Sequence, residues 1–217
     1  MVVGKQTEGQ SSSTIKDMAI RALRDLGEKK YNVMADVGAG RGELTERLVP
    51  YANTILMLDD YEEVDRPSKA QFVKADLNDF WNVPDNSVDF VFSLEVIEHI
   101  ENPRHFMREI KRIMKPGGYG FVSTPNNLNF FSKLNFFIKG EHRFFKDFSY
   151  PAHISVVTEV DFRRILNETG LTFMDFYYNY ADTMPITEWS LRFKNKGLSS
   201  TVGVLFQKNN SQLLTID

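Results

Sequence analysis

The chain has 217 residues, a formal net charge of −3 at neutral pH and no cysteine. Without cysteine it has neither disulfides nor cysteine-ligated metals. Its slightly acidic balance argues against nucleic acid as a partner, because phosphate binding requires a basic surface. Hydrophobic residues make up 42% of the chain and charged residues 25%, which is typical of a globular domain large enough to bury a core.

The first thirteen residues are polar, and we expect a flexible segment at 1–13 followed by one domain at 14–217. This start lacks the basic and apolar regions of a signal peptide. No apolar run reaches the roughly 20 residues that cross a bilayer. We therefore expect a cytoplasmic protein without a transmembrane segment.

Apolar runs of strand length then alternate with helical patterns. A first amphipathic helix runs from Ile15 to Leu26 and stops at Gly27. Near-continuous apolar strands that alternate with helices favour a parallel sheet covered on both faces, and the last two strands are expected to pair antiparallel. The predicted strands span 32–37, 54–58, 71–75, 88–94, 119–123, 171–178 and 201–207.

Capping residues mark two of the helices between these strands. Asn102 is a typical N-cap, and Pro116-Gly117-Gly118 is expected to end the helix that begins there. Thr158 and Asp161 have the spacing of a capping box, and Gly170 suits the end of the helix that they begin.

A glycine-rich turn, Asp36-Val37-Gly38-Ala39-Gly40-Arg41-Gly42-Glu43, joins a predicted strand to a predicted helix at 41–48. Such a turn lets the backbone approach a ligand closely, and the helix N-terminus offers free N–H groups. The dinucleotide fingerprint G-x-G-x-x-G would place its third glycine where Glu43 stands, and a carboxylate there repels a pyrophosphate. No Gly-Lys-Ser or Gly-Lys-Thr occurs, which excludes a phosphate-binding P-loop.

Acidic residues, rather than basic ones, follow the neighbouring strands. Asp59 ends a strand about twenty residues after the loop begins, where a carboxylate can accept the ribose hydroxyls. Asp76 and Leu77 end the next strand, where they can contact an adenine, and Asp36 can face a cationic group. The site therefore suits a positively charged nucleoside better than a polyphosphate.

Together with Lys115-Pro-Gly-Gly118, these positions resemble the class I S-adenosylmethionine-dependent methyltransferases. The segments Phe90–Ile100 and Ser123–Asn126 resemble the ubiquinone-biosynthesis-type O-methyltransferase branch. The resemblance implies an α/β fold, a Rossmann-like three-layer sandwich whose seven-stranded sheet is mostly parallel with an antiparallel last strand. It implies S-adenosylmethionine as the cofactor, with Asp59 favoured over Asp60 at the ribose. The implied cofactor-binding residues are Asp36, Gly38, Ala39, Gly40, Gly42, Asp59, Asp60, Asp76, Leu77, Ser93 and Leu94.

Glu95, Glu98 and His99 follow the fourth strand, and a helical turn there would place Glu95 and His99 on one face. One interpretation is a loop whose carboxylates are solvated. A second makes His99 a general base oriented by a glutamate. A third makes the three residues ligands of a divalent metal. Small-RNA 3′-end methyltransferases with a similar Glu-x-x-Glu-His bind metal and need a further histidine, for which His153 or His142 could serve. We take Glu95, His99 and His153 as the catalytic candidates.

Two insertions leave the sheet where ligands usually bind. The first, at 126–157, mixes aromatic residues with lysine and arginine. Three roles are open for this insertion. It packs as a lid on the sheet, it forms a lid that also shapes an apolar acceptor pocket, or it touches a membrane surface. We favour the lid that shapes the acceptor pocket. The second, at 181–199, contains Trp189 and a basic end at 192–196.

These features predict methyl transfer from S-adenosylmethionine to a small-molecule acceptor, at oxygen, by in-line displacement. Two alternatives stay open. One is a metal-assisted methyltransferase of the RNA 3′-end type, which Glu95, Glu98 and His99 favour and the acidic charge disfavours. The other is a non-catalytic nucleoside-binding module of the same fold.

Overall fold

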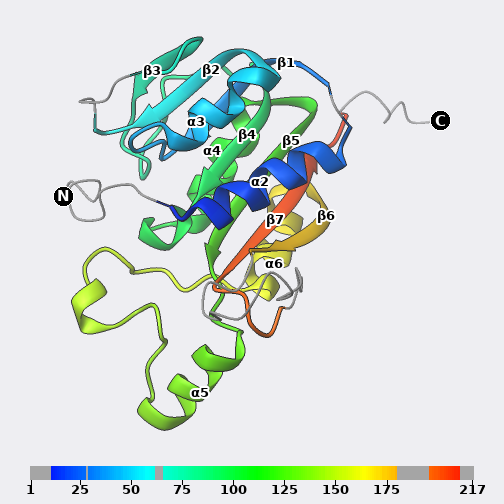
Figure 1. Ribbon diagram of the computed structural model, residues 1–217. Helices are drawn as coiled ribbons and strands as arrows, with labels where there is room; N and C mark the ends of the chain where they lie inside the picture. Colours follow the sequence, from blue (N-terminus) through cyan, green and yellow to red (C-terminus); the bar gives the residue numbers. More distant parts are fainter. Residues whose placement is uncertain (1–10, 28, 62–65, 180–195, 211–217) are drawn as a thin grey trace, which may run out of the picture.

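The computed structural model describes residues 11–27, 29–61, 66–179 and 196–210 (Figure 1). Its centre is a seven-stranded sheet in the order β3-β2-β1-β4-β5-β7-β6. Neighbours from β3 to β5 pair in parallel, and β7 pairs antiparallel with both β5 and β6. The strands are β1 (Tyr31–Val37), β2 (Ala52–Asp59), β3 (Ala70–Lys74), β4 (Val88–Leu94), β5 (Met114–Pro125), β6 (Leu171–Tyr178) and β7 (Thr201–Lys208).

Helices cover both faces of the sheet and give the expected three layers (Figure 1). On one face α2 and α3 pack against Phe90 and Phe92, whereas on the other α4 and α6 pack against Val91. Adjacent residues of β4 therefore point to opposite faces and are all buried, as in a parallel sheet with two covered sides. This confirms the expected Rossmann-like sandwich with an antiparallel last strand. The helices are α2 (Ser13–Asp25), α3 (Glu43–Leu48), α4 (Pro103–Ile113), α5 (Phe130–Lys139) and α6 (Glu159–Thr169), with short 3₁₀ turns η1 (Val49–Tyr51), η2 (Ile97–His99) and η3 (Asp147–Ser149).

The predicted helix caps are present in both helices. The Asn102 side chain accepts a hydrogen bond from the backbone N–H of His105 at 3.0 Å and begins α4. Thr158 and Asp161 form a reciprocal capping box at the start of α6, and Gly170 ends that helix in the left-handed conformation. These caps satisfy helix-terminal groups that would otherwise lack partners.

The prediction that Pro116-Gly117-Gly118 ends α4 is wrong. The helix ends at Ile113, and the chain enters β5 at once because Met114 pairs with Val88 of β4. The next pair is Phe90 with Tyr119, so Pro116-Gly117-Gly118 lies in a bulge within β5. A side chain at Gly118 would meet the carbonyl oxygen of Lys115 at 2.8 Å. The glycine is therefore needed for a backbone contact in the sheet rather than for a helix stop.

Some predicted segments lie outside the described residues. These are most of the flexible segment at 1–13 and most of the second insertion at 181–199, including Trp189, which all remain predictions. Within the described residues, no helix combines the length and the apolar character that crossing a bilayer requires.

Candidate active site

The glycine-rich turn lies where β1 ends and α3 begins. Gly38, Gly40 and Gly42 all have positive φ values, of 74°, 51° and 77°, which favour glycine because a side chain would be strained there. The backbone N–H groups of Gly38 and Ala39 donate to the carbonyl oxygen of Leu58 at 2.8 and 3.2 Å. The end of β2 therefore holds the turn in place beside the sheet.

Asp59 is buried at the end of β2 and contributes to the same turn. One of its carboxylate oxygens accepts from the backbone N–H of Gly40 at 2.8 Å, and the other accepts from that of Tyr61 at 3.1 Å. Each oxygen retains a second lone pair for a ligand hydroxyl. Asp60 is half-buried beside it, and burial, followed by its interactions with Asp59, raises the pKa of Asp60.

A pocket opens between the glycine-rich turn and α2, and we call it the cofactor pocket because the sequence predicts the cofactor there. Lys16 of α2 is only 6% exposed there, and its Nζ forms an ion pair with the carboxylate of Glu43. Sequence reasoning missed Lys16, because a lysine beside an apolar helical stripe is normally solvated. The residues that line the cofactor pocket are Ser11, Lys16, Asp36, Gly38, Ala39, Glu43, Leu44 and Leu94.

Asp36 is the buried anion of the cofactor pocket. Its carboxylate accepts a hydrogen bond from the hydroxyl of Thr45 at 2.7 Å. Burial raises the pKa of Asp36 to about 6, the nearby Asp59 raises it further, and Thr45 and Lys16 oppose the shift. A buried carboxylate and a buried ammonium in one pocket are complementary to a zwitterionic amino-acid group.

The remaining predicted cofactor residues lie at the ends of β3 and β4. Asp76 is exposed and accepts from the backbone N–H of Asn78 at 2.9 Å, while Leu77 is half-buried against the core. The buried hydroxyl of Ser93 donates to the carbonyl oxygen of Val37 at 2.9 Å. Ser93 thus joins β4 to the start of the glycine-rich turn through a bond within the protein.

The segment after β4 differs from the helical turn that was considered from the sequence. Only Ile97–His99 form a short 3₁₀ turn, and Glu95 precedes it with a φ of +56°. Glu95 and His99 therefore do not share one helical face. The carboxyl group of Glu95 accepts from the hydroxyl of Ser123 at 3.0 Å. Burial raises the pKa of Glu95 to about 7, against the opposing effect of hydrogen bonds from Ser123 and Thr201.

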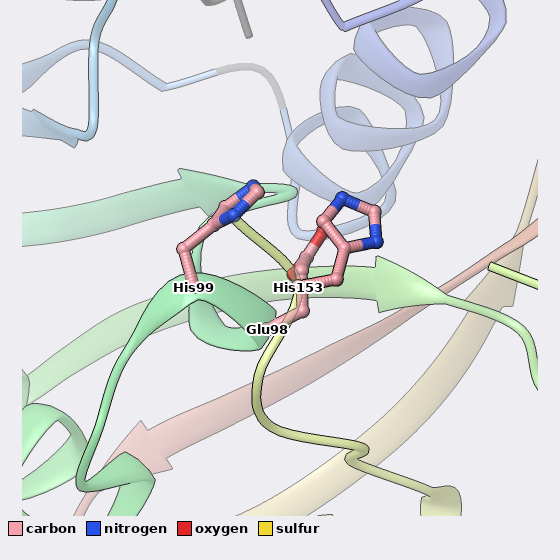
Figure 2. Close-up of side chains that lie close together, drawn as sticks. All are labelled: Glu98, His99 and His153. Atoms are coloured by element: carbon pink, nitrogen blue, oxygen red, sulfur yellow. The ribbon is translucent and has the colours of Figure 1, made fainter. Parts of the chain in front are cut away.

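Glu98, His99 and His153 form a compact group, which we call the Glu-His-His cluster (Figure 2). One potential ligand atom from each residue lies within 4.8 Å of the others. His153 reaches the cluster because the backbone N–H groups of the next two residues, Ile154 and Ser155, both donate to the carbonyl oxygen of Glu98 at 2.9 Å. These bonds fix the later segment against η2.

The other histidine considered from the sequence lies elsewhere. The ring of His142 is 5.0 Å from that of Phe136 and 6.3 Å from that of Phe145, measured between ring centroids. Among the described residues, the structure thus brings His153, and not His142, to Glu98 and His99.

Hydrogen bonds determine which ring nitrogen of each clustered histidine is available. Nδ1 of His99 lies 2.7 Å from the carbonyl oxygen of Ala152, and Nδ1 of His153 lies 2.6 Å from that of Phe144. A carbonyl oxygen only accepts, so both Nδ1 atoms carry the proton. In the neutral rings each Nε2 then keeps its lone pair for a metal ion or a proton.

Burial also shifts the pKa values of Glu98 and His99 in the Glu-His-His cluster. Burial is the main cause that lowers the pKa of His99, and His153 lowers it further. Burial, followed by the nearby charge of Glu95, raises the pKa of Glu98. The hydroxyl of Thr124 donates to the carboxyl of Glu98 at 3.2 Å. Two imidazoles and one carboxyl group are a donor set suited to a divalent cation such as Mn²⁺ or Zn²⁺.

A protein-family model described as a methyltransferase domain matches residues 15–175. The chain belongs to this methyltransferase family. It is 33% identical over 128 residues to the mitochondrial ubiquinone biosynthesis O-methyltransferase of Dictyostelium discoideum, a match that covers 50% of this chain and 40% of that protein. It is 27% identical over 154 residues to the ubiquinone biosynthesis O-methyltransferase of Coxiella burnetii, covering 63% of this chain and 65% of that one. The methyltransferase chain thus spans less than two thirds of the length of these relatives.

Solved structures agree with the methyltransferase fold. A chain from the complex between the Haloferax volcanii Trm112 methyltransferase activator and a methyltransferase superposes with a TM-score of 0.68 at 17% identity, covering 95% of this chain and 96% of that chain. An S-adenosylmethionine-dependent methyltransferase from Aquifex aeolicus superposes with a TM-score of 0.63 at 19% identity, covering 95% and 98%. At these identities the likeness concerns the fold alone.

The expected membership of the class I S-adenosylmethionine-dependent methyltransferases is thus confirmed, and with it the expected cofactor of the family. The cofactor pocket fits this cofactor chemically, since Lys16 and Asp36 match the two charges of its amino-acid end. The roles of the individual site residues and of a metal remain predictions.

Proposed function

We propose that this methyltransferase methylates a hydroxyl oxygen of a small-molecule acceptor, and that a divalent cation at Glu98, His99 and His153 holds that oxygen. The observation that carries the proposal is the position of the Glu-His-His cluster. It begins four residues after Leu94, which lines the cofactor pocket. Two relatives named as O-methyltransferases support oxygen as the acceptor atom.

In this proposal the cofactor supplies a methyl group that is activated by a sulfonium. Lys16 exchanges its ion pair with Glu43 for one with the cofactor carboxylate, and Asp36 receives the cofactor ammonium. Asp59 accepts the ribose hydroxyls with its remaining lone pairs, while Asp76 and Leu77 contact the adenine. These residues would hold and orient the cofactor, which would supply its methyl group to the acceptor oxygen.

A divalent cation lowers the pKa of a bound hydroxyl group and so favours its ionised, nucleophilic form. His99 and His153 present their Nε2 atoms because backbone carbonyls hold both Nδ1–H groups. Thr124 orients the carboxyl group of Glu98. Glu95, with its pKa near 7, is matched to taking up a proton at neutral pH.

Metal binding tests the cluster without knowledge of the acceptor. Isothermal titration of Mn²⁺ and of Zn²⁺ into the chelator-treated protein is expected to show one site. His153→Ala should weaken the affinity at least about tenfold. His105→Ala, on α4 and outside the cluster, is the matched control and should bind as the unaltered protein does.

Turnover tests the chemistry. S-adenosylhomocysteine release is measured with hydroxylated aromatic acceptors, with Mn²⁺ or with a chelator, and in parallel with short RNA acceptors. Loss of turnover in chelator supports the metal. Full turnover in chelator that His99→Ala abolishes would instead assign His99 as the general base. Turnover of RNA alone would favour the RNA 3′-end alternative, and binding of the cofactor without any turnover would favour the non-catalytic module.

A further inference from the structure

Apolar residues on one side of helix α5 are exposed in the described structure, although Arg143 lies over one of them, Phe131. The helix follows the carboxyl end of β5 and projects away from the sheet (Figure 1). Phe137 is 88% exposed and Ile138 is 67% exposed, and Ser132 is the buried residue of this helix. At about 100° per residue, five apolar residues fall within an arc of about 120°. They are Phe130, Phe131, Leu134, Phe137 and Ile138.

This orientation is the reverse of that of an ordinary surface helix, which turns its apolar stripe toward the core. Here the small polar Ser132 is buried, while the apolar Phe137 and Ile138 are exposed. Contiguous exposed apolar surface of this kind marks an interaction site more often than a packing defect.

The base of α5 is held firmly, so this orientation is built into the fold. The buried Asn129 side chain accepts from the backbone N–H of Ser132 at 2.8 Å and caps the helix. The backbone N–H of Phe130 donates to the carbonyl oxygen of Gly197 at 2.7 Å. The amide of Asn126, also buried, donates to the carbonyl oxygen of Lys196 at 2.9 Å.

The charge around α5 is opposite in sign to that of the whole chain. Residues 126–150 contain four basic and two acidic residues, whereas the chain as a whole has a net charge of −3. On α5 itself, Lys133 lies about 40° from Phe137 and so beside the apolar arc, whereas Lys139 lies on the side of Ser132. Arg143 and Lys146 follow the helix. Basic side chains beside an exposed apolar helix face are complementary to an anionic lipid surface.

We propose that α5 and the segment up to Lys146 dock the protein on an anionic membrane surface. The apolar side of α5 enters the boundary between headgroups and acyl chains, and the basic side chains of Lys133, Arg143 and Lys146 meet the lipid phosphates. A single chemical signal gives only weak membrane binding, and this segment combines two. The docking itself does not depend on the proposed function.

A row of aromatic rings joins this docking surface to the Glu-His-His cluster. The distances between ring centroids are 5.0 Å for Phe136–His142, 6.3 Å for His142–Phe145, 5.4 Å for Phe145–His153 and 4.8 Å for His153–His99. On the proposed function, which this step requires, an acceptor dissolved in the membrane would enter the active site from the side of α5.

Flotation of the full chain with vesicles tests the docking. Binding is expected to vesicles of phosphatidylcholine mixed with phosphatidylglycerol, and to fall when phosphatidylglycerol is left out or salt is raised. Phe137→Glu combined with Ile138→Glu should weaken binding more than about tenfold, and Lys133→Glu about fivefold or more. Val160→Glu on α6, where Val160 is 50% exposed, is the matched control and should leave binding unchanged.

Binding of S-adenosylhomocysteine, measured for each variant, shows that the fold is intact and that only docking has changed. The proposal is overturned if the unaltered protein does not float with anionic vesicles. It is equally overturned if the Phe137 and Ile138 variant floats as well as the unaltered protein does. Self-association that this variant abolishes, without vesicle binding, would assign the face to a second copy of the chain.

Discussion

We expect Asp36 to make cofactor affinity depend on pH. In the free protein its pKa is raised to about 6, so the carboxyl group is mostly protonated at about pH 5 and ionised at about pH 7.5. Only the ionised form attracts the cofactor ammonium, and the neighbouring charges of Asp59 and Lys16 are already included in that pKa. The affinity for S-adenosylhomocysteine should therefore fall about tenfold as the pH drops from about 7 to about 5.

Isothermal titration of S-adenosylhomocysteine across this range checks the prediction. Asp36→Asn should bind more weakly at neutral pH, and its affinity should no longer change with pH. A pH dependence that persists in Asp36→Asn would place the titrating group elsewhere.

Lys16 is expected to recognise the carboxylate of the cofactor and nothing else in it. Lys16→Met should lower the affinity for S-adenosylhomocysteine about tenfold or more, because a charge-assisted hydrogen bond is lost. The affinity for 5′-methylthioadenosine, which lacks the amino-acid end, should stay the same. Glu43, which the variant leaves without its ion pair, is partly exposed and remains solvated.

Titration of both ligands into Lys16→Met and into Lys30→Met, an exposed lysine outside the pocket, measures this difference. An equal loss of affinity for both ligands would contradict the carboxylate role and indicate a general effect on the pocket.

The residue types and their spacing in the sequence predicted only part of the candidate site. Asp36 and Leu94 could be placed beside the glycine-rich turn because each lies at the end of a strand that reaches it. Lys16 could not, since its burial arises from the packing of α2 over that turn. Either His153 or His142 could serve as the further histidine in the sequence, and His153 was taken as the catalytic candidate. The hydrogen bonds from residues 154 and 155 to Glu98 are what bring His153 to the cluster.

At the scale of elements, the glycine-rich turn packs closely against the segment that leads into the Glu-His-His cluster. A Cβ atom at Gly38 would lie 2.3 Å from a methyl group of Val96, and Gly38 has a φ of +74°. Gly38→Ala should therefore lower the free energy of unfolding by about 3 kcal/mol, from backbone strain together with overpacking. It should also weaken both cofactor and metal binding.

Urea denaturation of two further variants separates these causes. Gly140 has a similar φ of +71° with no atom within 4 Å of an added Cβ, so Gly140→Ala should lose only about 1 kcal/mol. Adding Val96→Ala to Gly38→Ala removes the clashing methyl groups and should restore cofactor affinity. If it restores nothing, the contact with Val96 does not set the position of the turn.

Element positions were predictable wherever burial produced a continuous pattern. The strands at 88–94 and 171–178 match β4 and β6 at both ends. Turn residues precede both of them, Asn86-Ser87 before β4 and Gly170 before β6. β5 begins five residues before the predicted start at 119, since its glycines serve a bulge whose need arises from the neighbouring strand. The outward orientation of α5 could not be predicted, because an amphipathic pattern identifies an apolar side but not what it faces.

At the scale of the whole molecule, the glycine-rich turn, the Glu-His-His cluster and the α5 insertion all follow the carboxyl ends of parallel strands β1, β4 and β5. In open parallel sheets this edge is where ligands bind. Cofactor binding should therefore stabilise the fold, because on the proposed site it would join α2, β1 and β2 around one molecule.

S-adenosylhomocysteine at about one hundred times its Kd should stabilise the protein by about 2.7 kcal/mol, which raises Tm by roughly 5 to 10 °C for a domain of this size. NAD should not, because Glu43 stands where the dinucleotide fingerprint requires its third glycine. Thermal unfolding with each ligand, with and without Mn²⁺, measures both effects. Stabilisation by NAD but not by S-adenosylhomocysteine would contradict the assignment of the pocket, whereas a separate increase with Mn²⁺ that His153→Ala abolishes would place the cation in the Glu-His-His cluster.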